Sequence, residues 1–174
     1  GSMLRDFAIV ATAMGASFQE IKKAGLAGIL SLFIGIGVAF VLGATAAWLM
    51  GYPDAESMTT IGAGACTYIV GPVTGAAIGA SSDVIAISIA TGVIKSIVTT
   101  IATPFFAKQM GLDNPNTAMV FGGMIGTTSG VAAGLAATDP KLVPYGALTA
   151  TFYTGLGVLL CPSILYYLTG LLVS

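Results

Sequence analysis

The chain has 174 residues, of which 56% are hydrophobic and only 7% are charged, whereas soluble domains carry roughly 25% charged residues. So few charged side chains cannot cover a water-facing surface, which excludes an ordinary soluble domain. The net charge of -1, with scattered basic residues, excludes a nucleic-acid footprint. Two cysteines without any histidine exclude a disulfide framework, a Cys/His metal site and a histidine-based triad.

Long stretches without charge make up most of the chain. About 20 apolar residues are needed to cross roughly 30 Å of hydrocarbon. One stretch, 84–107, has Lys95 as its single charge, and four others have none: 24–50, 58–82, 114–138 and 142–174. We therefore predict an all-α, polytopic membrane protein with about five or six transmembrane helices.

The first segment, 4–18, is too short to span comfortably, and we expect it to be the end of a helix or a half-helix that enters the membrane. Lys22 and Lys23 precede the longest clean helix, 24–50, and the turn after it carries two acids and no base. By the positive-inside rule, the end with the two lysines is cytoplasmic.

The stretch 59–95 is long enough to cross a bilayer but is interrupted. The interrupting residues are Gly62, Gly64, Gly71, Pro72, Gly75 and Gly79, followed by Ser81, Ser82 and Asp83. Inside a membrane, a broken helix is tolerated only where protein or a watery cavity surrounds its freed N–H and C=O groups. Broken apolar helices with one or two ionisable groups indicate the binding site of a secondary transporter.

Residues 117–138 show the same chemistry ahead of a second break, Asp139-Pro140-Lys141. An offset of 58 to 59 residues superposes Gly71, Gly75, Pro104 and Gly111 on Gly130, Gly134, Pro162 and Gly170. This is typical of transporters built from repeats, and in a chain so rich in glycine it is equally compatible with chance. We expect a single transmembrane transport domain, 1–174, with two discontinuous Gly-rich segments and candidate repeat units at 58–111 and 117–170.

Lys95 lies near the middle of an apolar helix, where its ammonium cannot easily reach either membrane surface. A lysine at the bilayer centre costs about 2.5–3.5 kcal/mol, so we expect it to face a cavity or a carboxylate. It is either a ligand for an anion or a lysine that is paired inside the bundle.

Two short polar clusters offer hard oxygen ligands for Na⁺: Asp83 with Ser81 and Ser82, and Asp139 with Thr138. The alternative for the first cluster is a helix cap, since Ser and Asp before Val84 are good N-cap residues. Thr127, Thr128 and Ser129 resemble the start of a half-helix, where hydroxyls and free amides hold a carboxylate. The alternative for these three is packing between helices.

Several long motifs resemble the larger, MadM-type subunit of the bacterial malonate:sodium symporter. They are TTIGAGACTYIVGPVTGAAIGASSDVIA (59–86), TGVIK (91–95), GLDNPNTAMVFGG (111–123) and SGVAAGLAATDPKLVPYGALTATFYTGLG (129–157), with LRDFAIVATA (4–13) at the start. The resemblance implies import of the malonate dianion coupled to Na⁺ across the bacterial cytoplasmic (inner) membrane, together with a smaller MadL-type subunit. It also implies further helices before the point where this chain starts.

The hypothesis is therefore a multi-pass transporter subunit that works by alternating access and is not an enzyme. Lys95, Thr127, Thr128 and Ser129 would bind malonate, and Ser82, Asp83 and Asp139 would bind Na⁺, the coupling ion, with no cofactor. The expected partners are malonate, Na⁺, the small subunit and the lipid bilayer, and a homo-oligomer is compatible with this hypothesis. The alternatives are a passive pore or exporter of the CidB/LrgB type and a purely structural membrane subunit.

Overall fold

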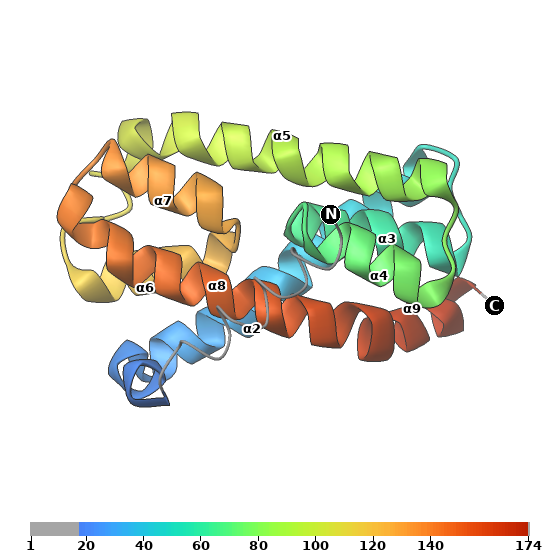
Figure 1. The fold of residues 1–174 in the computed structure, drawn as a ribbon, viewed down its shortest axis with the longest axis horizontal. Helices are drawn as coiled ribbons and strands as arrows, with labels where there is room; N and C mark the ends of the chain where they lie inside the picture. Colours follow the sequence, from blue (N-terminus) through green and yellow to red (C-terminus); the bar gives the residue numbers. More distant parts are fainter. Residues whose placement is uncertain (1–17, 174) are drawn as a thin grey trace.

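The computed structural model describes residues 18–173, and within this range every regular element is a helix (Figure 1). Residues 4–17 of the expected first segment lie outside it. Five elements form the first part: α2 (Phe18–Leu49), α3 (Ala55–Cys66), α4 (Val70–Ile78), α5 (Ser82–Phe106) and α6 (Pro115–Ile125). Then come α7 (Thr128–Ala136), the 3₁₀ turn η1 (Pro140–Leu142), α8 (Val143–Leu160), the π-helical turn η2 (Cys161–Leu165) and α9 (Tyr166–Val173).

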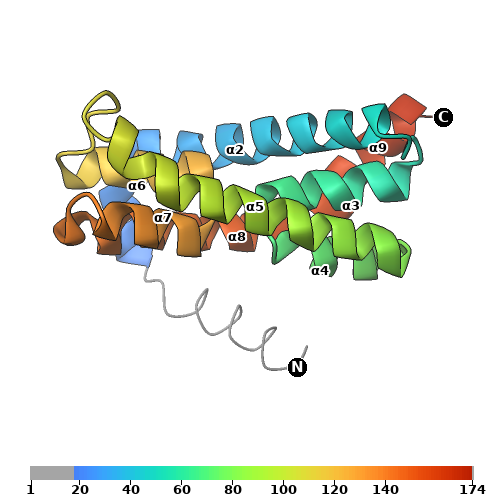
Figure 2. The same cartoon turned by 90° about the horizontal axis from the view of Figure 1, so that it is seen from above.

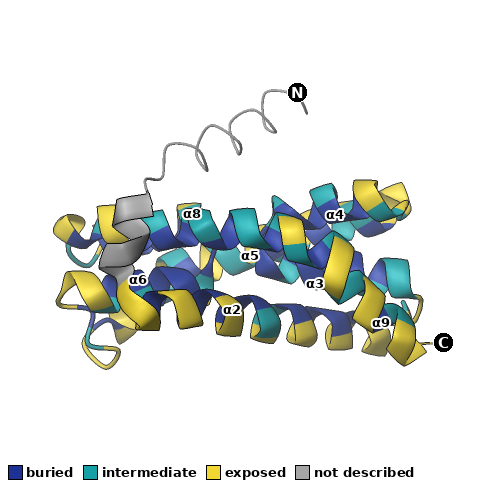
Figure 3. Cartoon of the chain, turned by 90° about the horizontal axis from the view of Figure 1, so that it is seen from below, coloured by how far each residue is buried: buried dark blue, intermediate teal, exposed yellow. Residues whose placement is uncertain are grey.

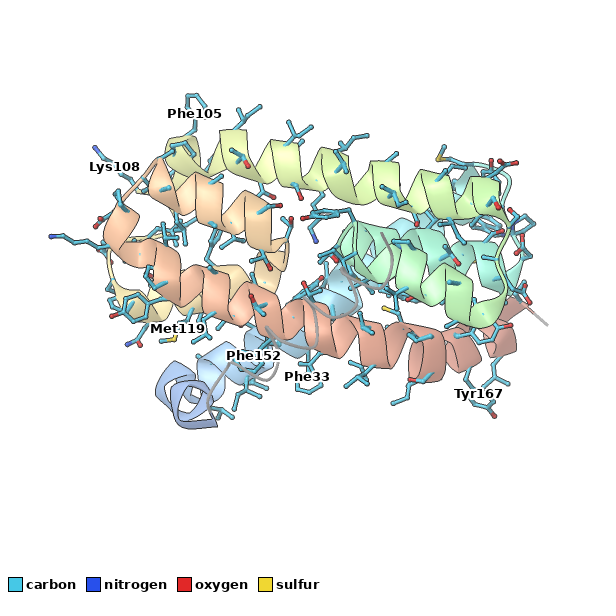
Figure 4. The ribbon with its side chains drawn as sticks, in the orientation of Figure 1. Phe33, Phe105, Lys108, Met119, Phe152 and Tyr167 are labelled. Atoms are coloured by element: carbon cyan, nitrogen blue, oxygen red, sulfur yellow. The ribbon has the colours of Figure 1, made fainter. Side chains whose placement is uncertain are left out.

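Within residues 18–173, three helical segments are long and apolar enough to cross a membrane: Gly25–Leu49, Ser82–Phe106 and Pro140–Val173. Their outward side chains are mainly apolar, including Phe33, Phe105 and Tyr167, which point away from the bundle (Figure 4). On α2, the buried residues line the inner edge and the exposed ones face outward (Figure 3). Apolar side chains on the outside are what lipid requires, so the predicted all-α polytopic fold is confirmed.

Two of the expected crossings turn back halfway. A methyl group on Gly71 would lie 2.8 Å from the Cα of Gly64, and one on Gly75 would lie 2.8 Å from Cγ2 of Thr60. The helices α3 and α4 therefore run antiparallel, and we call them the first hairpin. The chain leaves the helix at Thr67, whose backbone is extended (φ -154°, ψ 156°).

The second hairpin consists of α6 and α7. Its break is at Gly126, in the left-handed conformation (φ 80°), followed by the extended Thr127. Gly146 on α8 faces both arms, because a methyl group there would meet the carbonyl of Ala118 and the side chain of Leu135. Both predicted discontinuous segments are thus present. Residues 18–173 contain three full-length spans and two hairpins, where about five or six transmembrane helices, two of them discontinuous, were expected.

The two hairpins occupy opposite ends of the bundle (Figures 1 and 2). The first begins after the end of α2, packs on α2 and on the first half of α5, and returns to the same end. The second begins after the end of α5 and packs on α2, α5 and α8. Each hairpin starts with a side-chain cap at the outer end: Asp54 accepts from Ser57 N at 2.8 Å, and Asn114 accepts from Thr117 N at 3.1 Å.

The two ends of the bundle differ in charge. The end with the start of α3 and of α5 carries Asp54, Glu56 and Asp83, whereas Lys108 and Lys141 lie in the connections at the other end. Lys108 points outward there (Figure 4). Lys22 and Lys23 are close to the start of α2, and α2 starts at the same end of the bundle as Lys108 (Figure 1). By the positive-inside rule, we predict that the end with Lys108 faces the cytoplasm.

This arrangement predicts which loops can be labelled from outside an intact cell. Pro53→Cys and Asp83→Cys, before and after the first hairpin, should both react with a membrane-impermeant maleimide. Gln109→Cys should react only after permeabilisation, because α5 separates it from the other two. The unmodified chain is the control, since Cys66 and Cys161 are buried. Labelling of Pro53→Cys and Asp83→Cys from opposite faces would contradict the hairpin.

Candidate functional site

The tips of both hairpins lie beside the middle of α5. Lys95 is the 14th residue of this 25-residue helix, and its Nζ donates to the carbonyl oxygens of Ala65 and Cys66, each at 2.9 Å. The next residue, Ser96, shares a hydrogen bond between its hydroxyl and that of Thr127 at the second tip. We call Lys95, Ser96, the two hairpin tips and the residues packed on them the central site.

Tyr153 of α8 completes the central site from the opposite side. Its ring lies 5.5 Å from Lys95 Nζ, within the range of a cation–π contact. Its hydroxyl donates to the carbonyl of Gly35 on α2 at 3.1 Å, and its side chain is fully buried. The ring also packs on the second tip, because a methyl group on Gly126 would collide with it. Tyr153 thereby connects α2, α5, α8 and the second hairpin.

A cavity of about 280 Å³ lies beside the Lys95 side chain. Its walls are mainly apolar and come from α2, through Gly35 and Ala39, from Ala65 at the first tip and from Met124 near the second. Its size is just below the range of about 300–1,000 Å³ for small-molecule pockets, which suits a small ligand. Val38 and Leu42, which are exposed on the outer face of α2, also line the cavity, so it is open toward the outside of the bundle. Lys95 is therefore a part-buried cation next to a small, open cavity in an apolar bundle.

The two tips expose opposite backbone groups. At the first tip, the Thr67 hydroxyl accepts from Ile69 N (3.2 Å) and Val70 N (3.1 Å), so the amides of α4 are capped. The carbonyls of Ala65 and Cys66 at the end of α3 hold the lysine. The first tip therefore presents oxygen atoms, with the negative end of the α3 dipole behind them.

At the second tip the arrangement is reversed. The Thr127 side chain bonds to Ser96 and makes no cap to α7, which leaves the first amides of α7 without a side-chain acceptor. The carbonyls of Gly123 and Met124 lie against the α2 backbone, where a methyl group on Gly35 would be 2.6 Å from each oxygen. Thr128 is half-buried and Ser129 exposed, and neither hydroxyl bonds to another residue within 18–173. The second tip thus has N–H and O–H groups without side-chain acceptors, which are the groups that hold an anion at a helix start.

The residues predicted to bind Na⁺ do not come together. Ser82 and Asp83 are exposed in the first turn of α5, where Ser81 is the cap and accepts from Val84 N at 3.4 Å. Asp139 caps η1 at the other end of the bundle and accepts from Lys141 N at 3.0 Å. A 25-residue helix is about 37 Å long, so no single ion can bind both carboxylates in this arrangement. Binding of Na⁺ by Ser82 and Asp83 stays a prediction.

Sequence reasoning missed Ser96, Tyr153 and the carbonyl ligands of Lys95. The repeat offset contained a signal for one of them, since Tyr153 follows Lys95 by 58 residues and occupies the corresponding place in the next long helix. The carbonyls carried no such signal, because every residue has one. Three hydroxyls of the first hairpin, those of Thr59, Thr60 and Thr74, are buried without a partner in the described structure.

Discontinuous helices that end beside a charged side chain inside an apolar bundle define the class of secondary membrane transporters. The chain belongs to one family of this class, the malonate/sodium symporter MadM subunits, whose family model matches residues 1–173. The family resemblance expected from the motifs is confirmed. No curated protein and no solved structure matches the chain.

The contact between Gly126 and Tyr153 predicts a sensitive position. Gly126→Ala places a side chain on a left-handed residue and against a buried ring. We expect it to lower the free energy of unfolding by roughly 2–5 kcal/mol, measured by denaturant titration of the purified protein. Gly37→Ala is the matched control. Gly37 lies on α2, and a methyl group there would meet nothing within 4 Å, so the change should be neutral or stabilising by up to about 1 kcal/mol. Equal effects of the two changes would contradict the described packing.

Proposed function

We propose that this chain forms the translocation core of a Na⁺-coupled malonate importer, which works by alternating access around the central site. The observation that carries the proposal is Lys95, a part-buried cation with only uncharged partners, placed between two interrupted hairpins. A cation without a counter-charge inside a bilayer is costly, and an anionic substrate supplies that charge.

In this proposal, malonate lies between the two tips. One carboxylate binds the ammonium of Lys95. The other accepts hydrogen bonds from Thr127, Thr128, Ser129 and the first amides of α7, where the helix dipole favours negative charge. A short dicarboxylate suits a site in which one cation and one set of donors are separated by only a few side chains. The chemistry is binding and release, with no bond made or broken, so the chain is not an enzyme and needs no cofactor.

We further propose that α3–α5 and α6–α8 are two units of an inverted repeat within the single transport domain. Each unit is a hairpin followed by a long helix, and the units start from opposite ends of the bundle. Close contacts recur at the same offset. A methyl group on Gly64 would meet the Ser88 carbonyl, and one on Gly122 would meet the Gly146 carbonyl, with both residues shifted by 58. Two such units can open the central site to either face in turn.

The family description supports further proposals about the cellular setting. The chain would be a multi-pass protein of the bacterial cytoplasmic membrane, with the Lys108 end inside. It would act with a smaller MadL-type subunit, and its substrates would be malonate and Na⁺.

Uptake measurements test this function. Labelled malonate should accumulate in proteoliposomes that contain the chain and its small partner when an inward Na⁺ gradient is imposed, and should not accumulate when choline replaces Na⁺. A passive pore would give flux that is insensitive to the gradient. A purely structural subunit would give no malonate binding by the chain alone.

Lys95 is the most informative substitution. Truncating one partner of a buried charge interaction costs about 2–5 kcal/mol, so Lys95→Ala should weaken the apparent malonate affinity at least ~30-fold and abolish uptake. Lys108→Ala is the matched control, because Lys108 is exposed outside α5 and should leave uptake unchanged. Normal uptake and affinity in Lys95→Ala would contradict the charge role.

A further inference from the structure

We propose that the coupling Na⁺ binds at the end of α3, on the carbonyl oxygens of Ala65 and Cys66, and that the Lys95 ammonium occupies this position when no substrate is bound. We call these two oxygens the carbonyl pair. The inference rests on the proposed function and adds the ion site and the means of coupling.

The first step is the origin of the carbonyl pair. The last carbonyls of a helix have no partner within the helix, and the helix dipole adds a partial negative charge there. Because the backbone becomes extended at Thr67, α3 ends inside the bundle instead of in water. Thr67 N bonds to Ala63 O at 3.2 Å, which leaves the later carbonyls for other partners. Cys66 itself is fully buried, so these oxygens need a cation or a donor.

The second step is how Lys95 is held. Among residues 25–173, the carboxylates all lie at the ends of the bundle: Asp54, Glu56 and Asp83 at one, Asp113 and Asp139 at the other. Lys95 is held instead by two carbonyl oxygens and one ring face. Neutral oxygens at the negative end of a helix are also what a hard cation binds. The Lys95 ammonium therefore occupies a position in which a free cation of the same charge can bind.

The third step is charge. Na⁺ beside an ammonium that stays in place would bring two positive charges together in an apolar site, and malonate alone would leave an excess negative charge. One ammonium, one Na⁺ and one dianion are neutral together. The flexible stem of Lys95 can turn its ammonium from the carbonyl pair to a carboxylate at the adjacent second tip, which leaves the pair to Na⁺. Each ligand then favours the other, and this reciprocity is the coupling.

The test is Na⁺ binding to the purified chain, followed as a saturable rise in melting temperature when Na⁺ replaces choline at constant ionic strength. The unmodified protein should show this rise only with malonate present. Lys95→Met, which is similar in length and uncharged, should bind Na⁺ without malonate, with an apparent Kd at least tenfold lower than that of the unmodified protein. Lys95→Arg keeps a cation and should show no gain. Lys108→Met is the control at an exposed site and should behave as the unmodified protein does.

The outcomes separate this inference from the proposed function. If Lys95→Met loses malonate binding but gains no Na⁺ binding, the ion site is wrong and the substrate role of Lys95 stands. If it gains Na⁺ binding and keeps full malonate affinity, the carbonyl pair is supported and the substrate role is wrong. Loss of Na⁺ binding in Asp83→Asn, with no gain in Lys95→Met, would overturn the inference in favour of the start of α5.

Two further measurements test the inference even if Lys95→Met does not fold. Lys95→Gln is a second neutral variant with the same expected gain. In the unmodified protein, malonate should raise the Na⁺ affinity at least tenfold, and Na⁺ should raise the malonate affinity by the same factor. Equal Na⁺ affinity with and without malonate would overturn the inference without any substitution.

Discussion

The structure depends on the contact between one part-buried ammonium, that of Lys95, and the broken end of one helix. An interrupted helix in an apolar bundle leaves backbone oxygens without partners, and a lysine in the middle of a membrane span leaves a cation without a partner. Each is unfavourable alone. In this fold they satisfy each other, because Lys95 lies at the level where α3 ends. The first hairpin can therefore end inside the bundle because Lys95 is there, and Lys95 is tolerated there because the hairpin ends beside it.

Close contacts between helix backbones allow the end of α3 to lie beside Lys95. Both hairpins approach their neighbours where glycine replaces a side chain, at Gly64 against Ser88 and at Gly122 against Gly146. Small residues let helices approach within hydrocarbon, where no hydrophobic force brings them together. As a result, four half-helices fit between the long helices, and their inner ends meet at the central site instead of facing lipid (Figure 1).

The central site is asymmetric although its two hairpins are alike in outline. The Thr67 hydroxyl accepts from the amides at the start of α4 in the same hairpin, whereas Thr127, at the equivalent break, bonds to Ser96 and leaves α7 uncapped by a side chain. The first tip thus offers oxygens and the second offers donors. A site with these two surfaces suits a cation and an anion side by side, which is the pair of substrates named for the MadM family.

The sequence by itself determined the helical membrane fold, the two interrupted segments and the central place of Lys95, because hydrophobic length, glycine content and an isolated charge are properties of consecutive residues. It also contained both alternatives for the start of α5, where Ser81 proved to be the cap. Only the tertiary structure decided that the interrupted segments turn back, that Lys95 binds carbonyls 29 and 30 residues earlier, and that Tyr153 lies against it. An apolar segment has the same composition whether it crosses the membrane or returns. Backbone oxygens have no side-chain signature, so their role emerges only when packing brings distant helices together.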